Sequence, residues 1–240
     1  MLVTTRGIVI RSVKYSETSI IVKIYTEEYG LQSFIIKGVR SKKAKMKAAL
    51  FQSLQMLELA FYHHDNKKIH HLREAKISVA YQSIPYDAVK RSVLMFLTEV
   101  LNRSLRENLP DEALFNWLWQ ALLWYDLNEE RTTDFHLVFL MQLTRFLGFY
   151  PKQAEAGRYR YFDLMEGVFK NSEPPHRHFI SAESAKTFEK VSAASFNDIA
   201  ALALSSTDRR RLLNTLTEYY RLHVENFGEV KSLDVLRELF

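Results

Sequence analysis

The 240-residue sequence contains no cysteine, only seven glycines and five prolines, and no long apolar run. The absence of cysteine excludes disulfide bonds and any zinc site that is built on thiolates. The longest unbroken apolar run, residues 199–204, is far shorter than the roughly 18 residues that a membrane span needs. The first residues also lack the apolar core of a signal peptide. With 47% hydrophobic residues, the composition indicates a globular protein, which we expect to be cytoplasmic.

Acidic residues are scarce in the first third of the chain. The first 80 residues hold 14 Lys/Arg but only 6 Asp/Glu, a net charge of +8, whereas the other 160 hold 19 and 22, a net charge of −3. No acid occurs from residue 29 through residue 57. Because such asymmetry points to a partner of opposite charge, we expect the first third to bind a polyanion such as nucleic acid.

Short runs of β-branched and aromatic residues, separated by turn residues, fill the chain as far as Pro85. Gly30 is expected to supply a positive φ between the second run and the third. Five strands in such a short segment favour a small closed barrel, because closure removes exposed edges, and the five-stranded OB-fold is the natural candidate. The predicted strands cover residues 7–14, 18–26, 31–39, 51–62 and 67–81.

After Pro85 the apolar residues recur at helical spacing. Residues 152–180 show no clear period and predict a long ordered loop or a short hairpin. The fold class is therefore α+β with two domains, an OB-fold β-barrel over residues 1–82 and an all-α helical domain over residues 83–240 with an irregular insertion at about 152–180. Helices are expected to begin near 86 and 110, to run from Thr132 to Leu147 with Gly148 beyond the end, and to cover 181–191, 196–204, 207–226 and 232–239.

The strongest functional signal is a segment in which six of eleven residues are cations, namely Lys37, Arg40, Lys42, Lys43, Lys45 and Lys47. Arg11, Lys14 and Lys23 on neighbouring strands are expected to extend this basic surface. Such cations bind phosphates and release condensed counterions, which gives a salt-dependent affinity that does not depend on base sequence. The alternative interpretation is a solvated loop that is basic for solubility.

Aromatic side chains accompany the cations. Tyr15, Tyr25 and Phe34 can offer rings to unstacked bases. Three tryptophans, Trp117, Trp119 and Trp124, lie on one predicted helix. Their spacing favours core packing, with a groove for a partner peptide as the alternative.

Histidines occur in the pairs His63–His64 and His70–His71, and as His176 with His178. Without cysteine they do not form a recognised ligand set, so we interpret the first four as exposed hairpin histidines and expect no metal. Asp65, Glu74 and Lys76 match a permissive nuclease pattern, which keeps a nuclease open as a weak alternative. The motifs of phosphate loops, zinc proteases and acyl transferases are missing, so we expect neither an enzyme nor a cofactor.

Several segments together carry a family resemblance: Arg6–Ser19, Ile24–Gly30, Lys37–Arg40, Phe51–Leu59, Leu147–Pro151 and Tyr161–Phe169. They resemble the RecO family of bacterial recombination mediators over nearly the whole chain. The resemblance implies an OB-fold followed by a helical domain, binding of single- and double-stranded DNA, and annealing of complementary strands. It also implies loading of recombinase onto DNA coated by single-strand-binding protein, with RecR and the acidic C-terminal tail of that coating protein as partners, in a cytoplasmic, nucleoid-associated location.

One departure from the family pattern concerns residues 152–180, where many relatives carry a cysteine-based zinc site. This chain has no cysteine there, and His176 with His178 cannot complete a four-ligand site. We therefore expect packing to hold the segment, through the aromatic residues Tyr159, Tyr161, Phe162 and Phe169.

The helical region also contains arginines near aromatic residues. A peptide with an apolar end and acidic residues can dock on such a surface, and we name Arg131 and Arg145 as candidate contacts. The alternative function for the chain as a whole is an RNA-binding or ribosome-associated OB-fold protein.

Overall fold

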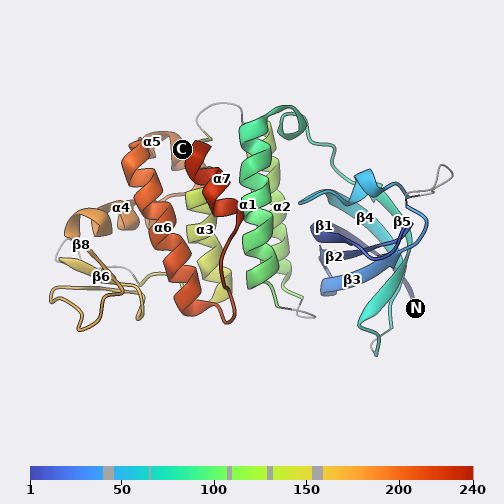
Figure 1. Cartoon of the computed structure of the whole chain (residues 1–240), viewed down its shortest axis with the longest axis horizontal. Helices are drawn as coiled ribbons and strands as arrows, with labels where there is room; N and C mark the ends of the chain where they lie inside the picture. Colours follow the sequence, from blue (N-terminus) through green and yellow to red (C-terminus); the bar gives the residue numbers. More distant parts are fainter. Residues whose placement is uncertain (40–45, 65, 107–109, 129–131, 153–158, 240) are drawn as a thin grey trace. The chain divides into compact units, whose positions relative to one another are not determined.

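A computed structural model describes residues 1–39, 46–64, 66–106, 110–128, 132–152 and 159–239. Its chain divides into two compact units, Met1–Leu127 and Asn128–Phe240. The first unit holds the barrel and two helices, and the second holds a small sheet and further helices (Figure 1). Within the described ranges, no helix is long and apolar enough to cross a membrane.

The N-terminal sheet is a closed barrel with the strand order β1-β2-β3-β5-β4, which confirms the predicted five-stranded OB-fold barrel. Strand β3 pairs with β5 in parallel, and the other neighbours are antiparallel. Its strands are β1 (Leu2–Lys14), β2 (Ile20–Thr26), β3 (Gly30–Ile36), β4 (Met56–Tyr62) and β5 (Ile69–Ile77). Gly30 has the expected positive φ, at 64°.

Strand β1 begins five residues earlier than the sequence predicts, because it serves two partners. Its first half pairs with β4 and its second half with β2, so that one long strand closes the barrel. Gly7 lies where the partners change, and a Cβ there would come within 2.7 Å of Ile24 and 2.8 Å of Leu59. The close approach of these two side chains favours glycine at this position. Phe34 and Phe61, whose ring centroids are 5.0 Å apart, lie in the core that this closure encloses.

Strand β4 begins at Met56, later than predicted, because Phe51 ends a 3₁₀ turn, η1 (Ala48–Phe51), and a further turn with Leu54 at a φ of 56° follows it. Beyond the barrel, the first unit contains η2 (Ile84–Tyr86), α1 (Ala88–Ser104) and α2 (Glu112–Leu127). Helix α2 covers part of the outer barrel face, with Phe115 against Tyr25 at a centroid distance of 6.2 Å. Trp119 is buried on the same helix, whereas Trp117 and Trp124 are half-buried, so core packing explains Trp119 best.

The second unit contains α3 (Phe135–Leu147), which ends at Gly148 as predicted. The elements that follow are β6 (Tyr161–Asp163), β7 (Val168–Lys170), β8 (Phe179–Ser181), α4 (Ala182–Ala193), η3 (Phe196–Asp198), α5 (Ile199–Leu202), α6 (Ser206–His223) and α7 (Ser232–Leu239). The short hairpin that was one of the two expectations for 152–180 is present as β6 and β7, and β8 adds a third strand on the other side of β6.

The small sheet is held by aromatic packing, as the absence of cysteine led us to expect. Phe162 is fully buried, and its ring centroid lies 4.7 Å from that of Phe169 and 4.4 Å from that of Phe188 on α4. The Tyr159 ring lies 4.6 Å from Phe169. Tyr161 packs edge-on against Phe179 of β8. These contacts join all three strands to a helix.

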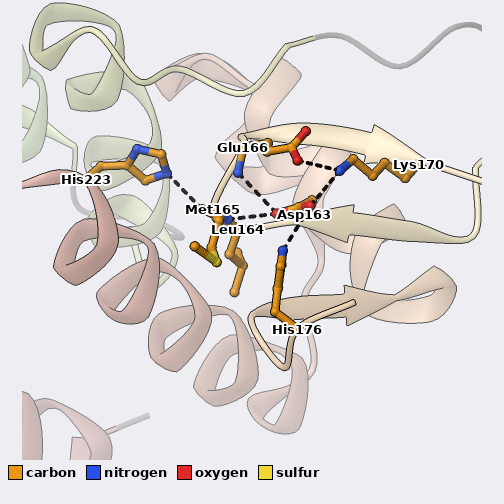
Figure 2. A network of polar contacts seen from close by, with 7 residues as sticks. All are labelled: Asp163, Leu164, Met165, Glu166, Lys170, His176 and His223. Carbon is orange, nitrogen blue, oxygen red and sulfur yellow. Dashed lines mark hydrogen bonds and ion pairs between the residues drawn. The ribbon is translucent and has the colours of Figure 1, made fainter. Parts of the chain in front are cut away.

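A polar network, which the sequence did not indicate, completes the same sheet (Figure 2). The fully buried carboxylate of Asp163 lies 2.8 Å from Lys170 Nζ and 3.3 Å from His176 Nε2. It also accepts hydrogen bonds from the backbone N–H groups of Met165 and Glu166, at 2.9 and 3.1 Å. The carboxylate thus ties the β6–β7 turn to the segment that leads into β8.

Candidate nucleic-acid interface

Strand register brings the ends of β1, β2 and β3 together at one rim of the barrel. Lys14 on β1 pairs with Ile20, and Ile20 pairs with Ile36 at the end of β3. Lys37 follows Ile36 directly, so it leaves the barrel at the rim where Lys14 and Tyr15 enter their turn. The basic segment that begins at Lys37 is therefore attached next to the β1–β2 hairpin.

A second basic feature crosses the outer face of the same strands. Arg11 pairs with Lys23, and Lys23 pairs with Ser33. Because paired residues of antiparallel strands lie on the same face of a sheet, these side chains form one row. Arg11 is exposed and Lys23 is half-buried. The register thus places the side chains of Arg11 and Lys23 next to each other, although they are far apart in the sequence.

The structure describes five of the nine cations that the sequence nominated: Arg11, Lys14, Lys23, Lys37 and Lys47. All except Lys23 are exposed. Within the described part of the chain, no ion pair occupies Arg11, Lys14, Lys37 or Lys47. Arg40, Lys42, Lys43 and Lys45 lie outside the described residues. Arg11, Lys14 and Lys37 therefore present positive charge, unpaired among the described residues, at the barrel rim and on the adjoining outer face. Lys47 is an exposed cation directly before η1.

Arg6, by contrast, is a structural residue. Its Nε lies 2.8 Å from Glu27 Oε2, and its guanidinium lies 4.9 Å from the centroid of the Trp119 ring. The hydrogen bond between Arg6 and Glu27 raises the pKa of Arg6 and lowers the pKa of Glu27. With one carboxylate and one ring already engaged, Arg6 joins the barrel to α2.

Two of the three nominated rings are not available to bases, which corrects the expectation for Tyr25 and Phe34. Tyr25 is 2% exposed, packs against Phe115, and donates its hydroxyl to the carbonyl of Asp111 at 3.4 Å. Burial, together with the nearby carboxylate of Asp111, raises its pKa. Phe34 is fully buried inside the barrel. Tyr15 is 63% exposed and keeps its ring in solvent.

The outer face also holds an apolar row that sequence reasoning missed. Val13 pairs with Ile21, and Ile21 pairs with Ile35, so their side chains cross three strands next to the Arg11–Lys23 row. Val13 is exposed and both isoleucines are half-buried. Their alternation with the buried residues of the same strands is the signal that the sequence offers, but apolar β-branched residues at outward positions are also typical of ordinary strands.

The histidine pairs do not form the exposed cluster that we expected. His70 is 2% exposed and stacks on His63 with ring centroids 5.4 Å apart. Burial lowers the pKa of His70, and the neighbouring His63 lowers it further. Among the residues that the structure describes, no three or more potential ligands come together as a metal site.

The weak nuclease pattern has little support from the geometry of β5. Lys76 Nζ lies 2.9 Å from Glu58 Oε1, so the ammonium is already paired across the sheet. Glu74 is exposed on the same strand. Asp65 lies outside the described residues.

Of the two candidate partner contacts in the second unit, Arg145 is described and Arg131 lies outside the described residues. Arg145 is exposed near the end of α3. Its guanidinium lies 4.3 Å from the centroid of the Tyr150 ring, and its Nη2 donates to the Tyr150 hydroxyl at 2.8 Å. The Tyr150 hydroxyl in turn donates to the carbonyl of Ser192. The arginine is thus held in place on the surface.

Comparison with known proteins covers nearly the whole chain. The family model for the N-terminal part of recombination protein O matches residues 1–81, and the model for its C-terminal part matches residues 85–234. The chain is 39% identical to a DNA repair protein RecO of Bacteroides fragilis, 38% identical to that of Phocaeicola vulgatus and 36% identical to that of Flavobacterium psychrophilum. Each match covers 100% of both sequences. The chain therefore belongs to the RecO family of DNA repair and recombination proteins.

Proposed function

We propose that the protein is a non-enzymatic mediator of recombinational repair that binds single- and double-stranded DNA through residues 1–82. The observation that carries this proposal is the group of exposed cations Arg11, Lys14 and Lys37, which bear no ion pair within the described part of the chain and lie on one rim and the adjoining outer face of the barrel. We include Lys23, Arg40, Lys42, Lys43, Lys45 and Lys47 in the same surface. Family membership supports a role in DNA repair and recombination.

Annealing of complementary strands follows from the same electrostatics. A cationic surface lowers the repulsion between two strands, and weak, exchangeable phosphate contacts leave the bases free to search for their complements. In our proposal residues 83–240 carry the partner contacts, with RecR, with the acidic tail of single-strand-binding protein, and through them with recombinase loading. A cytoplasmic, nucleoid-associated location accords with this role.

The salt dependence of DNA binding tests the proposed phosphate contacts. If about four to six phosphates are contacted, log K falls against log salt with a slope of roughly −3 to −5. Replacing Lys42, Lys43, Lys45 and Lys47 together with alanine should flatten that slope by about 2 to 3, because each lost phosphate contact removes somewhat less than one released counterion. Titration of labelled DNA by fluorescence anisotropy at several salt concentrations measures both slopes.

The matched control replaces Lys67, Lys68, Arg73 and Lys76 with alanine, which removes the same charge from a different segment of the chain, the β4–β5 turn and β5. An unchanged slope in the first variant, or an equal loss in both, would contradict the assignment to residues 37–47.

Competition between single-stranded DNA and RNA of the same sequence separates the DNA-repair role from that of an RNA-binding protein. Incubation of DNA with Mg²⁺ or Mn²⁺ tests for nuclease activity.

Arg145 is our candidate contact for an acidic peptide tail. We expect Arg145→Glu to weaken binding of such a peptide by at least tenfold, because a charge-assisted contact becomes a repulsion. Isothermal titration with the tail peptide measures the affinity. Lys152→Glu, on an exposed side chain in the same unit, makes the same charge change and serves as control. Equal affinities of wild type and Arg145→Glu would remove Arg145 from the interface.

A further inference from the structure

The outer barrel face is covered at one end of the strands and open at the other. Near the β2–β3 turn, Tyr25 lies under Phe115 of α2. Toward the opposite end of the same strands, Val13 is 36% exposed and Tyr15, just beyond the strand, is 63% exposed. In unit 1 the helix therefore shields one end of this face and leaves the end near the basic rim accessible.

The open end combines apolar and cationic side chains in an ordered way. The apolar row of Val13, Ile21 and Ile35 spans three strands, or roughly 10 Å at the usual strand spacing of about 4.8 Å. The Arg11–Lys23 row runs parallel to it, two residues along each strand. On the other side of the apolar row lies the barrel rim with Lys14 and Lys37. An apolar strip between two cationic borders differs from the polar outer surface that a small barrel ordinarily shows to water.

Tyr15 extends this strip at the tip of the β1–β2 hairpin. Its backbone N–H donates to the carbonyl of Ser19 at 3.0 Å, and the N–H of Ser16 donates to the same carbonyl at 3.2 Å. The Ser19 N–H donates back to the Ser16 hydroxyl at 3.2 Å. These bonds fix the backbone of the tip, so that an exposed ring stands on an ordered turn two residues beyond Val13.

We propose that Tyr15 and the apolar row form a platform for unstacked bases, and that this platform makes the barrel prefer single-stranded over double-stranded DNA. The inference rests on the proposed DNA-binding function. Cations on both borders bind the phosphates, and the bases of a single strand lie on the ring and the aliphatic side chains between them. A duplex offers the same phosphates but keeps its bases paired, so it gains nothing from the platform.

The test compares three labelled ligands of equal length: a single strand, the corresponding duplex, and an abasic single strand that has phosphates without bases. We expect Tyr15→Ala to raise the Kd for the single strand about tenfold, because stacking contributes strongly for each base that is held. The Kd for the duplex and for the abasic strand should stay within about twofold, with an unchanged salt slope. Tyr15→Phe keeps the ring and should bind the single strand as tightly as wild type. Val13→Thr keeps the volume of the side chain but makes it polar, and should weaken single-strand binding several-fold.

Tyr86→Ala is the matched control, since Tyr86 is 86% exposed in the same unit but lies on η2 rather than on the barrel. An unchanged single-strand Kd in Tyr15→Ala overturns the inference while leaving the proposed function intact. An equal rise for all three ligands also overturns it, because the residue would then act on the backbone. If the wild-type protein binds none of the ligands, the proposed function itself fails, and the platform with it.

Discussion

Asp126→Ala is expected to destabilise the first unit by about 3 to 5 kcal/mol, the loss typical for one partner of a buried charged network. The Asp126 side chain is buried at the end of α2 and accepts hydrogen bonds from three successive backbone N–H groups. Those donors belong to Gln82, Ser83 and Ile84, at 2.7, 3.0 and 3.0 Å. Alanine leaves the three N–H groups without their acceptor, and the buried donor of Ile84 alone costs about 1 to 3 kcal/mol when it is left unpaired.

A buried lysine makes this junction more sensitive still. Lys90 Nζ donates to the Ser83 hydroxyl at 2.7 Å and to the Tyr125 carbonyl at 2.9 Å, so its position depends on the loop that Asp126 orders. Urea unfolding followed by tryptophan fluorescence measures the loss, because all three tryptophans lie on α2. Asp87→Ala, which removes the exposed N-cap of α1 a few residues away, should cost only about 1 kcal/mol. If Asp126→Ala loses no more unfolding free energy than Asp87→Ala, the hydrogen bonds from residues 82–84 to Asp126 do not stabilise the first unit as proposed.

Asp163→Ala should destabilise the small sheet of the second unit by about 3 kcal/mol, because it removes a buried carboxylate with charged and backbone hydrogen bonds. Lys170 would lose its buried partner, and the β6–β7 turn would lose the acceptor for two N–H groups. Hydrogen exchange of residues 161–170 reports this region directly. Glu166→Ala removes the exposed partner of the same lysine and should change stability by less than about 1 kcal/mol. Equal protection in wild type and Asp163→Ala would contradict this role.

The Asp163 carboxylate should also make the stability of the second unit depend on pH. Burial alone would raise the pKa of Asp163, but the hydrogen bonds from Lys170, Glu166 and Met165 outweigh it and the pKa is lowered. A carboxyl group with a lowered folded-state pKa stabilises the protein above its unfolded value of about 3.9, and this contribution is lost as the pH falls through the lower folded value. We therefore expect the stability difference between wild type and Asp163→Asn to shrink as the pH falls below about 4.

Much of the candidate interface was predictable because its signals are local in sequence. The charge density of residues 37–47 and the missing acids around it need no tertiary information. The alternation that gives strands β2 and β3 was likewise readable, and Gly148 marked the end of α3. Tyr25 and Phe34 could not be placed, because alternation says that two faces exist but not which neighbour covers each of them. Only the packing of α2 on Tyr25 and the closure of the barrel around Phe34 decide that both rings are buried.

By itself the sequence determined a basic β-domain, a helical remainder and the absence of a thiolate metal site, because composition and hydrophobic period depend on near neighbours alone. The tertiary structure decided which cations share one rim, which apolar residues line up beside them, and which carboxylates are buried. Register sets these outcomes: Lys14 lies level with the end of β3, with β2 between them, because two hairpins pair in one alignment. A shift of one residue would turn every side chain to the other face. The open end of the outer face, and with it the proposed platform of Tyr15, exists only in the folded barrel.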